Sequence, residues 1–137
     1  MLHSIIIPCY KSSQTIREVV ELTSAELDRL GRPDYEFILV DDYSPDDGAT
    51  LKELRFSCCD YPFVKAISLA KNSGQHNAVM AGLNYAQGDL LIAMMMICRL
   101  TLPSFIFCWK RLKKATILFT DTIPIKSIPH SATLEVF

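Results

Sequence analysis

Two adjacent carboxylates, Asp41 and Asp42, directly follow an uninterrupted apolar run at residues 37–40. An apolar run of this length, bounded by turn residues, predicts a strand that is buried on both faces, as in a parallel sheet. Open parallel sheets bind ligands just beyond the carboxyl ends of their strands, so both carboxylates are candidate binding residues. They could instead cap the loop that follows, because residues 44–46 (Ser-Pro-Asp) favour a turn. Spacing alone leaves both interpretations open.

Other side chains with useful chemistry follow two further apolar runs. Tyr10 comes after the run at residues 4–7, and Lys71 comes after the run at residues 63–69. A nucleotide needs an aromatic or apolar wall, oxygen acceptors for its N–H and O–H groups, and a cation against its diphosphate. Tyr10, Asp41 and Lys71 could supply these three from successive strand ends. The alternatives are a loop aromatic that rests on the core and a solvated lysine.

The apolar patterns between these residues predict alternating strands and helices. Strands are expected at residues 4–7, 37–40, 63–69 and 90–94, the first of them stopped by Pro8. Helices are expected from Ser12 or Ser13 to Leu30, from Asp46 or Asp47 through Leu54, and at residues 74–86. This alternation predicts an α/β fold with a parallel, doubly wound sheet and right-handed crossovers.

Composition sets limits on the class of protein. The chain has 137 residues, half of them hydrophobic, which is enough for one globular domain with a real core. Its net charge of −1 argues against a general nucleic-acid binder. Residues 1–94 carry eight Lys and Arg against thirteen Asp and Glu, whereas residues 95–137 carry six against two. This shift predicts a domain at residues 1–94 and a separate, poorly ordered tail at residues 95–137.

Several further features are expected to be absent. The five cysteines form no C-x-x-C pair and have no histidine partner at metal-ligand spacing, which favours reduced thiols over a zinc site. The apolar residues 2–7 are too few for the core of a signal peptide. No stretch approaches the ~20 apolar residues that span a bilayer. We therefore expect a cytoplasmic chain without a transmembrane segment.

Four motifs in order give the chain a family resemblance. They are residues 4–10 (SIIIPCY), 40–46 (VDDYSPD), 71–78 (KNSGQHNA) and 88–89 (GD). This set resembles the family 2 glycosyltransferases, and most closely the branch that passes a sugar from a nucleotide donor to a polyprenyl phosphate. The resemblance covers residues 4–94. It implies the N-terminal, nucleotide-binding half of a GT-A fold, which is Rossmann-like with a mostly parallel sheet, in truncated form.

The resemblance also implies roles for particular residues. In such enzymes the loop after the first strand, here with Pro8 and Tyr10, holds the nucleobase and ribose, and Asp41 accepts hydrogen bonds from the base or sugar. Asp42, Lys71 and Gly74 are expected to complete the site for a UDP- or GDP-linked sugar. Intact relatives are expected to use a lipid-phosphate or glycan acceptor at the cytoplasmic face of a membrane, with Mg²⁺ or Mn²⁺ as cofactor.

The chain departs from the family after Met94. The family places a D-x-D motif there, whose carboxylates hold a divalent ion that neutralises the leaving diphosphate. This chain has Met95, Met96 and Ile97 at the corresponding positions. A thioether is a poor ligand for Mg²⁺ or Mn²⁺, and isoleucine offers no ligand at all. We therefore expect no cofactor and no intact catalytic residues in this chain.

The genetic code suggests how these acids were lost. Met94 to Ile97 must be written ATG-ATG-ATG-ATN, and a G restored after the first codon gives ATG-GAT-GAT-GAT, which encodes Met-Asp-Asp-Asp. The tail mixes apolar residues with prolines and has no clean helical or strand period, as in a poorly specified segment. Our hypothesis is that residues 95–137 are read in a shifted frame, from a lesion or a reading error. The alternative is a genuine C-terminal helix at residues 104–114.

Three interpretations of function remain. The chain can be a family 2 glycosyltransferase whose catalytic half is lost, or a non-catalytic nucleotide-binding module that uses the same pocket. A third class, the phospho-receiver domain, also gathers acids at strand ends. The receiver is disfavoured, because the motifs at residues 8–10 and 71–76 have no role in it.

Overall fold

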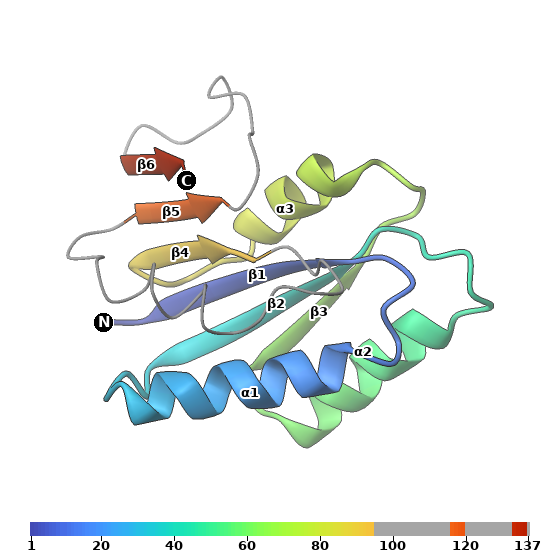
Figure 1. Ribbon diagram of the computed structural model, residues 1–137. Coiled ribbons are helices and arrows are strands. Elements are labelled where there is room, and N and C mark those ends of the chain that lie inside the picture. The colour runs from blue at the N-terminus through green and yellow to red at the C-terminus, as the bar shows by residue number, and fades with distance from the viewer. Residues whose placement is uncertain (95–115, 120–132, 137) are drawn as a thin grey trace.

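A computed structural model describes residues 1–94, 116–119 and 133–136 (Figure 1). In chain order the elements are β1 (His3–Cys9), α1 (Ile16–Arg29), β2 (Tyr35–Asp41), α2 (Ala49–Asp60), β3 (Val64–Ser68), α3 (Gln75–Leu83), β4 (Leu90–Ala93), β5 (Thr116–Phe119) and β6 (Thr133–Val136). The strands form one sheet in the order β3-β2-β1-β4-β5-β6, and each neighbouring pair is parallel. The predicted α/β fold with a parallel sheet is confirmed.

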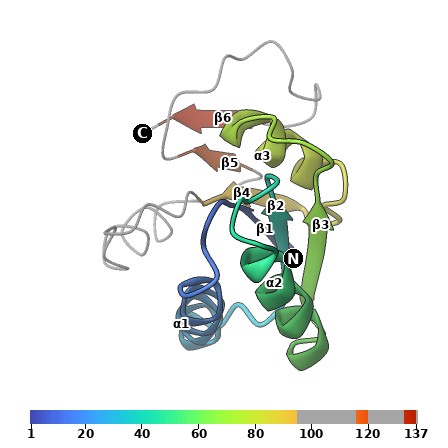
Figure 2. The ribbon, with the colours of Figure 1, turned by 90° about the vertical axis from the view of Figure 1, so that its right-hand side faces the viewer.

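Helices cover the sheet on both faces. α1 and α2 lie on one face and α3 lies on the other (Figures 1 and 2). In β1, Ile5 and Ile7 pack with α1, whereas Ile6 packs with α3. Successive side chains of a strand point to opposite faces, so a strand covered on both sides must be apolar throughout. This is why β1 and β2 read as unbroken apolar runs in the sequence.

The prediction that Pro8 stops the first strand is wrong, because β1 continues to Cys9. On the β4 side of β1, the backbone oxygen of Ile6 accepts a hydrogen bond from Met94 N, and on the β2 side the oxygen of Cys9 accepts one from Asp42 N. The backbone groups of every second residue in a strand point to the same neighbouring strand. The nitrogen of Pro8, two residues after Ile6, therefore faces the β4 side. Among the residues which the structure describes, the β1–β4 pairing reaches only Ile6. Within that pairing Pro8 replaces no ladder hydrogen bond, which is the condition that proline requires in a strand.

The predicted start of the first helix is also wrong. α1 begins at Ile16, and its N-cap residue is Thr15 rather than Ser12 or Ser13. The Ser12 hydroxyl is occupied by the backbone of Tyr10, from whose nitrogen it accepts a hydrogen bond and to whose oxygen it donates one. Glycine ends the helix as expected, since Gly31 has a φ of +69° that favours glycine.

The second helix begins later than predicted, at Ala49. Its N-cap residue is Gly48 rather than Asp46 or Asp47, so the predicted cap is wrong. Asp46 still satisfies one amide of the first turn, because its carboxylate oxygen Oδ2 accepts a hydrogen bond of 3.1 Å from the backbone nitrogen of Thr50. Asp47 has a left-handed φ of +54° and is not part of the helix. The third helix and the strands β3 and β4 lie within their predicted ranges.

Predictions for the tail fall mostly outside the described residues. Met95, Met96, Ile97 and the alternative helix at residues 104–114 lie there, so the division into a domain and a poorly ordered tail stays a prediction. None of the three helices in residues 1–94 combines the length and apolar composition needed to cross a bilayer.

A buried carboxylate ties the amino ends of three strands together. Glu36 on β2 is 6% exposed. It accepts hydrogen bonds of 2.6 Å from Ser4 Oγ on β1 and 2.7 Å from Lys65 Nζ on β3. The backbone nitrogen of Gln87 donates a third, also of 2.7 Å. Burial acts to raise the pKa of Glu36, but these donors outweigh it and hold the pKa below its usual value.

We expect this cluster to make stability depend on acid. The folded-state pKa of Glu36 is lowered, so its contribution is complete above the ordinary glutamate pKa of about 4.3 and is lost as pH falls through the folded-state value. Urea unfolding followed from about pH 7 to about pH 3 should show a steeper loss in the wild type than in Glu36→Gln. Parallel loss in the two proteins would contradict the assignment.

Candidate functional site

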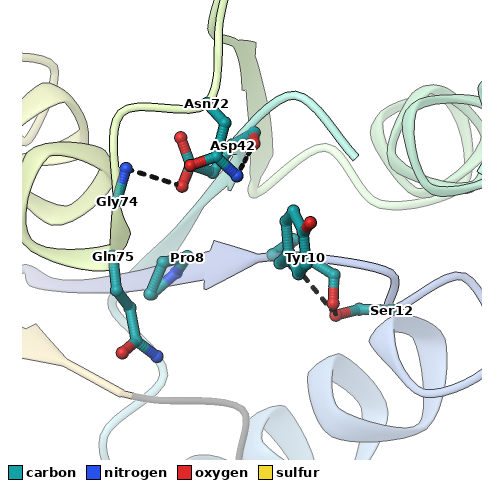
Figure 3. Close-up of a pocket in the computed structure, with 8 residues that line it drawn as sticks. Pro8, Tyr10, Ser12, Asp42, Asn72, Gly74 and Gln75 are labelled. Carbon is teal, nitrogen blue, oxygen red and sulfur yellow. Dashed lines mark hydrogen bonds between the residues drawn. The ribbon is translucent and has the colours of Figure 1, made fainter. Parts of the chain in front are cut away.

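A cavity of about 340 Å³ opens at the carboxyl ends of β1 and β2, beside the start of α3 (Figure 3). Its volume lies in the range of small-molecule sites. The loops after β1, β2 and β3 supply its walls. The residues that line it are Pro8, Cys9, Tyr10, Ser12, Asp42, Asn72, Gly74 and Gln75.

Four of the six predicted binding residues meet at this cavity, namely Pro8, Tyr10, Asp42 and Gly74. Asp41 is buried outside the lining, and its Oδ1 accepts hydrogen bonds from the nitrogen (3.2 Å) and the hydroxyl (2.6 Å) of Ser44. Asp41 therefore caps the loop, as the alternative interpretation expected. Lys71 is exposed and is also outside the lining. The ligand contacts of all six residues stay predictions.

Four further lining residues were not assigned a role from the sequence. Cys9 is the last residue of β1, Ser12 lies in the loop that follows, and Asn72 and Gln75 lie in the motif at residues 71–78. Their nearness to predicted site residues was the only signal in the sequence. Which of them face the cavity depends on how the loops fold back, and this is visible only in three dimensions.

Asp42 forms a rigid wall of the cavity. The residue is 5% exposed, and its carboxylate accepts hydrogen bonds from the nitrogens of Ser73 (2.7 Å to Oδ1) and Gly74 (3.0 Å to Oδ2). These amides precede α3, whose dipole favours a negative charge at this end. Gly74 has a φ of +87°, which a side chain would strain. The carboxylate thus joins the loop after β2 to the loop before α3 (Figure 3).

Tyr10 stands at the rim of the cavity. Its ring is 48% exposed, and the Nζ of Lys11 lies 5.7 Å from the ring centroid. An exposed aromatic ring beside a cavity offers a flat surface on which a planar base can stack. Within the described part of the chain, no group of three His, Cys, Asp or Glu residues is placed to hold a metal ion.

Cys9 lines the cavity but is expected to be unreactive. The side chain is fully buried, and burial, with the nearby Asp41 carboxylate, raises the pKa of its thiol to about 12. The thiolate is the reactive form of cysteine. Iodoacetamide at about pH 8 should therefore modify the exposed Cys59 while Cys9 stays free, as peptide mass mapping would show. Equal rates of modification would contradict this expectation.

The comparisons with known proteins agree with the geometry. The fold is a parallel α/β domain with a cavity at its strand ends, the architecture of the N-terminal half of GT-A glycosyltransferases. The chain belongs to glycosyl transferase family 2, whose family model matches residues 4–95. The predicted family is confirmed.

Curated relatives lie in the polyprenyl-phosphate branch. The undecaprenyl-phosphate 4-deoxy-4-formamido-L-arabinose transferase of Pseudomonas fluorescens is 44% identical over 91 residues, which are 66% of this chain and 26% of the relative. The transferase of the same name from Yersinia enterocolitica is 42% identical over 93 residues, 66% of this chain and 27% of the relative. The chain thus spans about a quarter of the length of these relatives.

Solved structures share the fold. TarS 1–349 from S. aureus, in complex with UDP, has a TM-score of 0.59 at 21% identity over 96% of this chain and 39% of that chain. The mannosyltransferase PcManGT from Pyrobaculum calidifontis, in complex with GDP-Man and Mn²⁺, has a TM-score of 0.53 at 23% identity over 65% of this chain and 25% of that chain. At these identities the likeness shows the fold alone.

Proposed function

We propose that residues 1–94 bind the nucleotide part of a nucleotide-sugar in the cavity at the ends of β1 and β2. The observation that carries the proposal is the convergence of Pro8, Tyr10, Asp42 and Gly74 on one cavity. The base would stack near Tyr10. Each oxygen of Asp42 accepts one hydrogen bond from the backbone and has a second lone pair left for an N–H or O–H of the ligand. Complexes of TarS with UDP and of PcManGT with GDP-Man support this ligand class.

We further propose that the complete protein of this type transfers a sugar from that donor to a polyprenyl phosphate or glycan on the cytoplasmic side of a membrane. The names of the curated relatives support the polyprenyl-phosphate acceptor. Mn²⁺ is present in the PcManGT complex, but residues 95–97 of this chain (Met-Met-Ile) are a poor donor set for Mg²⁺ or Mn²⁺. The present chain is therefore proposed to be inactive in transfer.

The second candidate function is a non-catalytic nucleotide-binding module. It is favoured by one observation, that among the residues which the structure describes, those lining the cavity all lie between residues 8 and 75, before the positions expected to hold a metal. The two candidates differ in whether the chain turns over a bound donor.

Calorimetric titration with UDP, GDP and their sugar conjugates, with and without Mn²⁺, would test both candidates. Nucleotide binding that is independent of the metal, without release of free nucleotide or transfer to a polyprenyl phosphate, supports the module. Sugar transfer that requires Mn²⁺ would contradict the proposed loss of the metal-binding site. Failure of every nucleotide to bind would contradict the assignment of the cavity.

The shifted reading frame has a direct test in the gene. We propose that the codons for residues 94–97 differ from an intact frame by one missing G. Resequencing this region from genomic DNA and from the transcript would show whether the series ATG-ATG-ATG-ATN is present. That series is expected for a lesion in the gene, whereas ATG-GAT-GAT-GAT would identify a reading error. The deciding observation for the shift itself is whether related genes read Met-Asp-Asp-Asp here. Related genes that share the present tail would contradict the proposal.

A further inference from the structure

The loop that carries Tyr10 and Ser12 is held by side chains from a different part of the chain. Lys11 lies in the middle of this loop with a φ of +50°, a left-handed conformation that is unfavourable for a residue with a side chain. The loop therefore needs contacts from outside to keep its shape. Those contacts come from the segment that follows β2.

Thr50, in the first turn of α2, makes the first of these contacts. Its hydroxyl accepts a hydrogen bond of 3.0 Å from the backbone nitrogen of Ser12, and it donates one to Oδ2 of Asp46. Thr50 is fully buried and Ser12 is 8% exposed, so water does not compete with these bonds. The Ser12 hydroxyl in turn bonds both the nitrogen and the oxygen of Tyr10, at 3.1 and 2.9 Å.

Ser44 makes a second contact of the same form. Its hydroxyl accepts a hydrogen bond of 3.1 Å from the backbone nitrogen of Lys11 and donates one of 2.6 Å to Asp41. In both cases a hydroxyl donates a hydrogen bond to a carboxylate, which leaves a lone pair of the same oxygen to accept a hydrogen bond from an amide of the loop. A hydroxyl does both through a single oxygen atom, and a charged acceptor strengthens the bond it receives.

We infer that Asp46 and Thr50 are positioning residues for ligand binding, which act through Ser12 to set the Tyr10 wall of the cavity. Neither Asp46 nor Thr50 lines the cavity, so their effect on a ligand is transmitted by the loop. The inference rests on the proposed binding of a nucleotide at this site. It assigns Asp46 a second task beside accepting the hydrogen bond from the Thr50 amide in the first turn of α2.

The test compares Thr50→Val, Thr50→Ser and Ser4→Ala. Valine keeps the shape of threonine but leaves the Ser12 amide without its acceptor, whereas serine keeps the hydroxyl. Ser4 is fully buried at the opposite end of the sheet, where its hydroxyl bonds Glu36 and the nitrogen of Gly88, so Ser4→Ala matches the loss of a buried hydroxyl away from the cavity.

We expect Thr50→Val to weaken binding of UDP or GDP, whichever the wild type binds, by about tenfold. Thr50→Ser should stay within about twofold of the wild type. Ser4→Ala should lower the urea midpoint but leave the nucleotide Kd unchanged. If Thr50→Val leaves the Kd unchanged, or if Ser4→Ala weakens binding as much, the inference is overturned. Should Thr50→Val not fold, Asp46→Asn replaces it with a smaller expected loss of about threefold, and an unchanged Kd overturns the inference in the same way.

Amide hydrogen exchange in the free protein keeps the inference separate from the proposed function. Thr50→Val should speed exchange at Lys11 and Ser12 by about tenfold more than at amides of the β1–β2 ladder. Uniform acceleration across the domain would overturn the inference. If the wild type binds neither UDP nor GDP while this local effect is present, the proposed function fails and the link from Thr50 to the loop stands.

Discussion

Replacing Asp42 with alanine is expected to abolish measurable nucleotide binding. The carboxylate is buried and accepts hydrogen bonds from the nitrogens of Ser73 and Gly74, so its removal leaves two amides without partners at the edge of the cavity. A donor that loses its partner costs up to about 1–3 kcal/mol where it is shielded from water, and these two partly buried amides also hold the loop before α3 in place. We expect the Kd for the bound nucleotide to rise by about a hundredfold or more.

The same variant should also lose stability, by about 2–4 kcal/mol in urea unfolding. Asp42→Asn should fall between the wild type and alanine, because its amide group keeps one acceptor but turns N–H groups toward one of the two backbone donors. Asp34→Ala is the matched control, since Asp34 is an exposed acid before β2, at the other end of the strand. Tight binding by Asp42→Ala would show that the ligand does not use this wall.

Replacing Gly88 with alanine is expected to cause the largest loss of stability among single methyl additions to this domain. An added Cβ would lie 2.6 Å from Ser4 Oγ and 2.8 Å from two backbone atoms, Leu2 O and Ser4 N. Backbone atoms of a central strand cannot move without disturbing its pairing. The change would also disturb the 2.8 Å hydrogen bond from Gly88 N to Ser4 Oγ, and we expect a loss of about 3 kcal/mol or more.

Substitutions at two other glycines provide a comparison for the stability loss expected at Gly88. At Gly82 in α3 an added Cβ would lie 2.5 Å from Ile6 Cγ2 and 3.1 Å from Val40 Cγ2, which are buried side-chain methyls rather than backbone atoms. Gly82→Ala should therefore also be destabilising, but by less than Gly88→Ala, at about 1–3 kcal/mol. Gly31 has open space around it and a positive φ, which asparagine tolerates, so Gly31→Asn should change stability by less than about 1 kcal/mol. Urea midpoints for the three variants would test the order. A smaller loss at Gly88 than at Gly82 would contradict the close approach of this loop to β1.

The fold was predictable because its signals are local. The apolar runs that became β1 and β2, and the glycine that ends α1, depend on residues next to one another in the chain. The errors at helix and strand ends have two sources. Pro8 is compatible with β1 because, among the described residues, the pairing of β1 with the distant β4 reaches only Ile6. The late start of α1 has a local cause, since the Ser12 hydroxyl bonds the backbone of Tyr10, two residues away.

The sequence by itself determined the parallel α/β fold, the family and the edge of the sheet where a ligand would bind, because alternating apolar runs and ordered motifs carry that information along the chain. Only the tertiary structure decided which of the two adjacent acids faces the cavity. Asp41 turns to Ser44 in its own loop, whereas Asp42 turns to the amides before α3. Neighbouring residues at a strand end point in different directions, and the partners of Asp42 come from a segment about thirty residues away, which spacing cannot reveal.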